Sequence, residues 1–299
     1  MTTRKLFTLS SCMCICLFII MAMCTGCRQQ ASRPKLSIDE IRSITAKFES
    51  VTNAYLNAWN MHDTEQMREQ FTENARYFEE GNAANESNVD TMLDFYKNLF
   101  ISNPDIQGYH IDTYIARKDG FDVWESWPAN GSMFTKENPI RAYDWYTLSD
   151  AKISRLWVLW GDKTLKTVHL EFNPQPLVDY ASAWSSGDPQ AVAALYSEDT
   201  IREDTLFGEK QQGSTAINEF SSDFFSWYPA VKLELRQAFG LESKDIRMTG
   251  GEYSIHVSDP VGSPCEVKAI ILLQMANEKI TSETVFYNPD SLIACGWAQ

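Results

Sequence analysis

The stretch Tyr180-Ala181-Ser182-Ala183-Trp184-Ser185-Ser186-Gly187-Asp188 decides the fold, because its pattern occurs twice in the chain. Residues 55–63 carry the same tyrosine, tryptophan and aspartate 125 positions earlier. The register then continues without a gap through the pairs Glu73 and Glu198, Phe95 and Phe220, Phe100 and Phe225, and Pro104 and Pro229. A period this long indicates a duplicated domain, since solenoid repeats span roughly 20 to 50 residues.

Each copy predicts the same order of elements: a long helix, a short helix, an irregular stretch, a third helix and several strands. The first helix is expected to begin at Ser37-Ile38-Asp39-Glu40, which has the spacing of a capping box. In the second copy we expect helices at 180–184, 191–196 and 214–227, and strands near 231–239, 252–258, 266–275 and 280–287. Helices followed by antiparallel strands are typical of the α+β class.

The two copies predict a first domain at 37–173 and a second domain at 176–290. The boundary is placed at Asn173-Pro174-Gln175-Pro176, because two prolines end the preceding strand.

Residues 1–27 have the pattern of an export signal, with Arg4 and Lys5 before an apolar run from Cys12 to Cys24. This run is too short to span a bilayer, which requires roughly 20 apolar residues. Cys24-Thr25-Gly26-Cys27 resembles a bacterial lipobox, although Cys24 replaces the usual leucine, so Cys27 is the expected site of lipidation. Residues 28–36 are polar and would form a tether. The expected location is the cell envelope, on the outer face of a bacterial membrane; an ordinary secreted protein and an uncleaved anchor are the alternatives.

Cys265 and Cys295 are the cysteines that remain beyond the leader and Cys27. An exported protein can form a disulfide. A hairpin turning at Asn277-Glu278 would place position 265 opposite position 290, close enough for Cys295 to reach it. Two unpaired thiols are the alternative.

Composition excludes several classes of function. The formal net charge is −14, which would repel a nucleic acid backbone. The sequence has no glycine-rich nucleotide loop and no nucleophile elbow, and its histidines have no metal-ligand spacing. We therefore expect no nucleic acid partner, no metal and no cofactor, and contact with the membrane only through the N-terminal lipid.

Four motifs of the second half resemble one family: Tyr180-x3-Trp184-x2-Gly187-Asp188, Leu195-Tyr196-Ser197-Glu198-Asp199, Glu203-Asp204, and Gly213-x2-Ala216-Ile217-x2-Phe220. They are similar to the SnoaL-like and ketosteroid-isomerase members of the nuclear-transport-factor-2-like (cystatin-like) superfamily. The first half resembles this family more weakly and lacks the glycine that opens the third helix. The resemblance implies two tandem cone-shaped domains, each a curved, mainly antiparallel sheet wrapped around three helices with an apolar pocket. Because many relatives pair through their sheets, the two domains are expected to form an intramolecular pseudo-dimer.

The resemblance also implies a site. Asp204 matches the position of the family's general base, and Tyr180 that of the tyrosine that binds the oxyanion. Ile270 stands where a second, protonated acid is expected, so one donor is missing, which typically costs about 10²- to 10³-fold in rate. The expected function is binding of a small apolar molecule; an isomerase- or cyclase-type enzyme using Asp204 and Tyr180 is the alternative.

Other residues are weaker candidates for ligand binding. Tyr55 and Glu79 occupy the equivalent positions in the first half, and His256, Ile270 and Trp227 could line the pocket of the second. Simpler roles are open for all of them: Tyr180 could be a core residue, and Asp204, next to Glu203, could cap a turn. The five tryptophans between 124 and 160 predict either an aromatic core or an aromatic surface that binds flat ligands.

Overall fold

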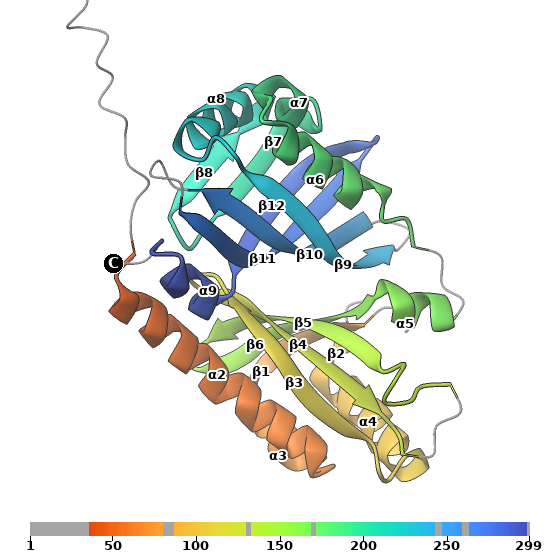
Figure 1. The fold of residues 1–299 in the computed structure, drawn as a ribbon. Coiled ribbons are helices and arrows are strands. Elements are labelled where there is room, and N and C mark those ends of the chain that lie inside the picture. The colour runs from red at the N-terminus through yellow and green to blue at the C-terminus, as the bar shows by residue number, and fades with distance from the viewer. Residues whose placement is uncertain are drawn as a thin grey trace, which may run out of the picture. The chain divides into compact units, whose positions relative to one another are not determined.

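A computed structural model describes residues 36–79, 87–129, 133–168, 172–242, 247–258 and 263–297 (Figure 1). The predicted leader, Cys27 and nearly all of the tether lie outside these residues. Within these ranges, no helix combines the length and apolar content that crossing a membrane requires.

The first half consists of two helices, a strand pair, a third helix and four strands. They are α2 (Ile38–Asn60), α3 (Thr64–Glu69), β1 (Phe71–Glu79), β2 (Ser87–Asn88), α4 (Val89–Ser102), β3 (Gln107–Ile115), β4 (Asp119–Trp127), β5 (Ile140–Ser149) and β6 (Lys152–Gly161). The short helix α5 (Asp162–Thr167) follows.

The second half repeats this order. Its elements are α6 (Gln175–Ser186), α7 (Pro189–Ala193), β7 (Tyr196–Asp204), β8 (Glu209–Gln212), α8 (Gly213–Trp227), β9 (Lys232–Glu242), β10 (Arg247–Ser258), β11 (Pro264–Ala276), β12 (Lys279–Tyr287) and α9 (Pro289–Ala294). The α+β class expected from the sequence is confirmed.

Helix termini explain several of the repeated residues. Asp63 and Asp188 are the N-caps of α3 and α7, and each side chain accepts a hydrogen bond from a backbone N–H of its helix. Gly187 has a left-handed backbone with φ of 69°, and His62 adopts the same conformation with φ of 56°. The predicted capping box of Ser37 and Glu40 is present at the start of α2.

The turn at Asn277-Glu278 joins β11 and β12, as the sequence predicts. Both residues have positive φ, 50° and 63°, the conformation of a type I′ hairpin turn. The first half has the same turn between β5 and β6, where Asp150 and Ala151 have φ of 51° and 57°.

The expectation of an irregular stretch before the third helix was wrong. In each half this stretch contains a nine-residue strand, β1 or β7. β1 pairs in parallel with β6, and β7 in parallel with β12. The polar run Ser197-Glu198-Asp199 hides the alternation of buried and exposed residues in β7.

The strands of the two halves join in one hydrogen-bonded sheet. The order is β11-β10-β9-β6-β5-β4-β3-β12-β7-β8, and β12 also pairs with β11, so eight strands close a ring. Two short seams connect the halves: Trp160 and Gly161 pair with β9, and Tyr287 pairs with Ile115.

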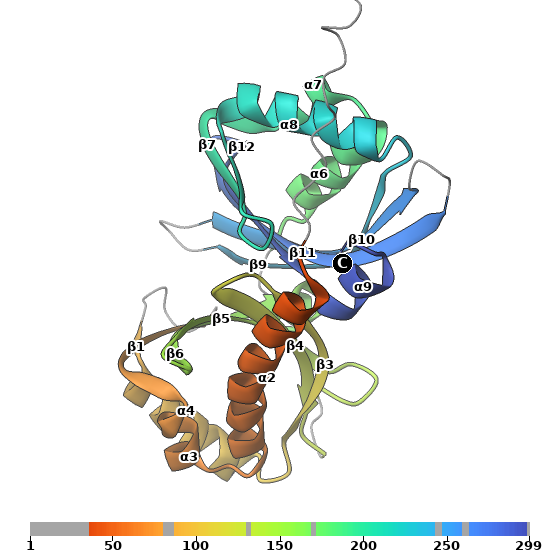
Figure 2. The same cartoon turned by 90° about the vertical axis from the view of Figure 1, so that its left-hand side faces the viewer.

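Three apolar clusters fill the spaces between the layers. One packs α6 and α8 against β9–β12, and a second packs α2 and α4 against the first-half strands (Figure 2). The third lies between the two sheets and contains no helical residue among those described. β11 shows the alternation: Ile271 faces the helices of the second half, whereas Ile270 faces the cluster between the sheets.

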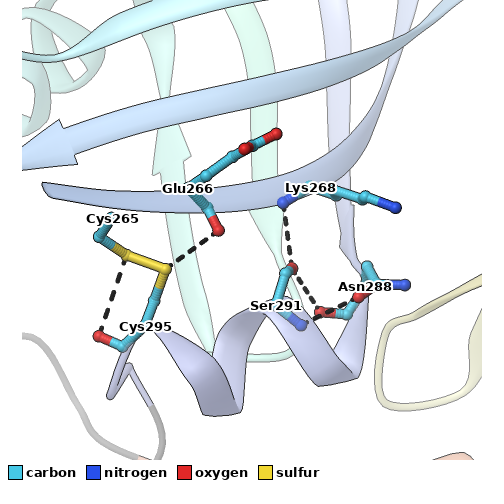
Figure 3. Close-up of a disulfide and its surroundings, with 6 residues drawn as sticks. All are labelled: Cys265, Glu266, Lys268, Asn288, Ser291 and Cys295. Carbon is cyan, nitrogen blue, oxygen red and sulfur yellow. Dashed lines mark hydrogen bonds between the residues drawn. A yellow bond between two sulfur atoms is a disulfide. The ribbon is translucent and has the colours of Figure 1, made fainter.

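A disulfide joins Cys265 at the start of β11 to Cys295 after α9, with 5.5 Å between the Cα atoms. Figure 3 shows two further contacts of α9: its N-cap Asn288 accepts from Ser291 N through Oδ1 at 3.0 Å, and Ser291 Oγ accepts from Lys268 N of β11 at 3.0 Å. The C-terminal helix is thus fixed to the sheet both covalently and by hydrogen bonds.

Candidate functional site

Glu283 is the centre of the second-half interior. Its side chain is fully buried on β12, and Tyr180 from α6 donates a hydrogen bond to Oε1 at 3.1 Å. Tyr196 donates to Oε2, and Arg202 Nε forms an ion pair with Oε1 at 2.9 Å. Burial, followed by the negative charge of Glu283, raises the pKa of Tyr180 well above its usual range, so this phenol remains a donor.

Arg202 completes this network. Its guanidinium lies over the Phe220 ring, 4.3 Å from the centroid, and Nη1 donates to Gln211 Oε1 at 2.9 Å. A buried ion pair of this kind holds its own charges in place and needs no external partner. Tyr180, the predicted oxyanion donor, therefore donates to an internal salt bridge.

Asp204 accepts hydrogen bonds from other groups than Tyr180, although its charge also acts on Arg202. Tyr287 donates to its Oδ2 at 2.6 Å, and the backbone N–H of Phe207 donates to its Oδ1 at 3.3 Å. The carboxylate is fully buried and stabilises the turn after β7 together with the end of β12. The structure thus gives the two predicted catalytic residues separate protein partners.

The remaining second-half candidates lie apart from this interior. Ile270 is on the opposite face of β11, in the cluster between the sheets. Trp227 ends α8 and packs half-buried against the core. His256 Nε2 lies 3.6 Å from Glu234 Oε2, and both side chains are half-exposed.

The interior of the first half holds a different set of polar groups. Tyr55 from α2, Tyr77 from β1, Tyr96 from α4 and Tyr146 from β5 are all buried there. Two carboxyl groups accompany them, Glu79 at the end of β1 and Asp144 on β5. We call these six residues the first-half interior cluster.

Hydrogen bonds connect only part of the cluster. Tyr77 donates to Glu79 Oε2, and its hydroxyl lies 3.4 Å from that of Tyr96. Tyr146 donates to Asp144 Oδ2 at 3.0 Å. Among the described residues, no hydrogen bond of full geometry reaches Asp144 Oδ1 or the Tyr55 hydroxyl. Tyr96 contacts the Tyr55 hydroxyl and Trp124 contacts Asp144, so these two buried groups have neighbours but no well-aligned hydrogen bond at Tyr55 Oη and Asp144 Oδ1.

Burial also shifts the acidity of the two carboxyl groups. It raises the pKa of Asp144 well above its usual range, and the nearby Trp124 and Tyr146 lower it by less. Burial likewise raises the pKa of Glu79, against the lowering effect of Tyr77 and Trp160. A carboxyl group that keeps its proton can donate a hydrogen bond, as a carboxylate cannot.

Sequence reasoning found Tyr55 and Glu79 but missed Asp144. In strand register Asp144 faces Val158, as Ile271 faces Val285 in the second half, so the two residues are equivalent. The available signal was an acidic residue within the aromatic run Tyr143-Asp144-Trp145-Tyr146. Of the tryptophans in this half, Trp124 and Trp157 are buried, whereas Trp127 stacks on the half-exposed Tyr109 at 4.4 Å.

Comparison with known protein families finds a match for one part of the chain. Residues 177–283 match the family model of the SnoaL-like domain. The SnoaL-like match thus covers the second half, from α6 to β12. No curated protein matches the sequence.

Three solved structures similar to this chain each cover less than half of it. A hypothetical protein with a ketosteroid isomerase-like fold from Catenulispora acidiphila, in complex with trimethylamine, is 20% identical over 43% of this chain and 96% of its own, with a TM-score of 0.38. A protein from Shewanella putrefaciens, provisionally assigned as a SnoaL-like polyketide cyclase, is 15% identical, with a TM-score of 0.35. The match covers 42% of this chain and 97% of that protein. A provisionally assigned isomerase from Bacillus subtilis is 15% identical, with a TM-score of 0.36. The match covers 42% of this chain and 92% of that protein.

Replacing the two equivalent tyrosines, Tyr180 and Tyr55, by phenylalanine is expected to have opposite effects on the stability of the protein. Tyr180→Phe removes a donor from the buried Glu283 carboxylate and should lower the free energy of unfolding by about 1.5–3 kcal/mol. Tyr55→Phe removes a buried hydroxyl whose contact with Tyr96 falls short of full hydrogen-bond geometry, and it should leave stability unchanged or raise it by up to about 1 kcal/mol. Urea unfolding of both variants measures the difference, and equal losses would contradict the assignment of hydrogen bonds.

The raised pKa of Asp144 predicts that the stability of the protein depends on pH. Because burial raises its pKa, the folded protein keeps a proton that the unfolded chain releases near pH ~3.9. The contribution of protonated Asp144 to the free energy of unfolding is full below the pKa of the unfolded chain. It is lost as the pH rises through the pKa of the folded protein. Asp144→Asn stays neutral, so its free energy of unfolding should fall less steeply than that of the wild type between acidic and neutral pH. The exposed Asp223→Asn is the matched control, and parallel curves for Asp144→Asn and the wild type would rule out the raised pKa.

Proposed function

We propose that this chain is a lipid-anchored, extracytoplasmic protein of two SnoaL-like domains that binds a small, largely apolar molecule in its first half. The ligand site is the first-half interior cluster. The main support for this proposal is a pair of buried polar atoms, Tyr55 Oη and Asp144 Oδ1, that make no hydrogen bond of full geometry within the described residues.

The tandem arrangement is supported by the repeated order of elements and by the equivalent caps Asp63 and Asp188. Contacts between the two sheets support the pseudo-dimer, since both seams and the helix-free cluster lie between equivalent surfaces of the two halves. The anchor rests on the lipobox-like sequence around Cys27, and the disulfide is compatible with an oxidising compartment.

A buried polar atom without a partner costs about 1–3 kcal/mol, so proteins retain such atoms where a ligand or water meets them. In the second half the equivalent Tyr180 is satisfied by Glu283, and Ile271 replaces Asp144. The two interiors have therefore diverged at these positions: Tyr180 donates to a buried carboxylate, whereas Tyr55 Oη and Asp144 Oδ1 make no hydrogen bond of full geometry.

The chemistry of the cluster indicates the class of ligand. The phenol of Tyr55 and a protonated Asp144 are both donors, so they would bind an oxygen acceptor such as a carbonyl. Trp59 and Trp124, with ring centroids 5.1 Å apart, supply an aromatic wall for an apolar body. We infer a neutral ring ketone or a similar molecule.

The binding experiment uses 1-tetralone, a neutral ring ketone, with the full-length chain in mild detergent and tryptophan fluorescence as the readout. Tyr55→Phe and Asp144→Leu should each weaken binding about fivefold to tenfold, because each removes one donor. Tyr180→Phe is the matched control and should leave the affinity unchanged. Weaker binding by Tyr180→Phe alone would place the site in the second half instead.

A second candidate function, proton transfer beside a carbonyl, is favoured by the position of Glu79. This carboxyl is half-buried with a raised pKa, as expected for a general base, while Tyr55 and Asp144 would stabilise the oxyanion. Proton transfer by Asp204 as the base, with Tyr180 as the oxyanion donor, has less support, because both groups already form hydrogen bonds within the protein.

Exchange of the α-protons of 1-tetralone for deuterium tests this second function by NMR. If Glu79 is the base, the wild type accelerates exchange and Glu79→Gln reduces the rate by at least about 10²-fold. Asp204→Asn should keep the wild-type rate if it folds. If the wild type exchanges these protons only at the uncatalysed rate, the catalytic proposal is wrong and the binding proposal remains.

A further inference from the structure

A pocket of about 220 Å³ lies between α2 and the turn that joins β3 to β4. It is outside the first-half interior cluster, because none of those six residues lines it. Phe48 separates the two regions: its ring forms part of the pocket wall and also packs edge-on against Tyr146 at 5.8 Å.

The inner wall of the pocket is apolar. Phe48 and Ala116 are buried there, and Ile44 and Leu148 are half-buried. Gly120 permits this arrangement, since a Cβ at that position would lie 2.5 Å from the Phe48 ring.

The outer wall is cationic. It contains Lys47 from α2 and Arg117 and Lys118 from the turn, all three exposed. In the part of the chain that the structure describes, Lys47 and Lys118 have no ion-pair partner, whereas Lys166, Lys210 and Lys268 each pair with a carboxylate. Arg117 is anchored from the other half, because its Nε donates to the Thr205 carbonyl at 3.1 Å.

One carboxyl group, Asp119, accompanies the three cations. Burial raises its pKa, while a hydrogen bond with Thr147 and the charges of Lys118 and Arg155 lower it by less. The pocket therefore carries a net positive charge in a chain whose formal net charge is −14. Such a reversal of local charge favours an anion.

We infer that this pocket binds a small organic monoanion, a carboxylate attached to a single apolar ring. The ring would contact Phe48 and Leu148, and the carboxylate would be bound by Lys47 and Lys118. The volume fits this size, because a cavity of about 150 Å³ holds benzene and sites for larger ligands start at about 300 Å³.

Isothermal titration calorimetry of the full-length chain with phenylacetate tests the inference. Its neutral analogue phenylacetamide should bind at least tenfold more weakly, and acetate, which lacks the ring, should not bind measurably. Raising the salt concentration should weaken the binding of phenylacetate, because the lysines are exposed. Equal affinities for phenylacetate and phenylacetamide would overturn the charge assignment.

Two variants locate the binding. Lys47→Gln combined with Lys118→Gln should weaken phenylacetate binding at least tenfold, and Ser43→Trp, which fills the pocket without changing its charge, should abolish it. Lys97→Gln combined with Lys152→Gln removes the same charge from exposed lysines elsewhere and is the matched control.

An equal loss in that control would show that net charge alone attracts the anion, and would overturn the inference. Unchanged binding in Ser43→Trp would do the same. Tyr55→Phe should keep full affinity for phenylacetate, so this test does not depend on the proposed site in the interior.

Discussion

The packing of the first-half strands against the second-half strands, within one continuous sheet, is the constraint on which the rest of this structure depends. Each half covers one face of its sheet with helices and leaves the other face apolar, and the two uncovered faces meet in a cluster that includes Phe121, Phe239 and Phe286. Glu252 adds polar contacts: it accepts hydrogen bonds from the hydroxyls of Tyr114 and Tyr143, each at 3.1 Å, and pairs with Arg141. This interface buries what would otherwise be an exposed apolar surface on each half.

Because the interface uses the outer faces of the sheets, it leaves the two interiors free to diverge. In the second half Glu283, Arg202 and two tyrosines satisfy one another. In the first half Asp144 stands where the second has an apolar residue, and no cation pairs with it among the described residues. One interior thus centres on a buried ion pair, and the other contains a buried phenol and a buried carboxyl oxygen without a hydrogen bond of full geometry, which is why we propose the ligand site in the half outside the SnoaL-like match.

The sequence predicted those features that depend on local chemistry. Asp63, Asp188, Ser37 and the Asn277-Glu278 turn act through contacts within a few residues, so their spacing was enough to predict them. The strands β1 and β7 were missed because they pair in parallel with distant strands, and their polar residues hide the alternation. The pairing of Asp204 with Tyr287 could not be predicted, since 83 positions separate them in the chain. The repeat does not point to Asp144, because the equivalent residue in the second half, Ile271, is apolar.

A crystal structure of the chain with 1-tetralone tests the central claim most directly. The account predicts the ketone oxygen within hydrogen-bond distance of both Tyr55 Oη and Asp144 Oδ1, with Glu283 and Arg202 still paired in the other half. A ligand bound between Tyr180 and Asp204, with that ion pair broken, would contradict the account.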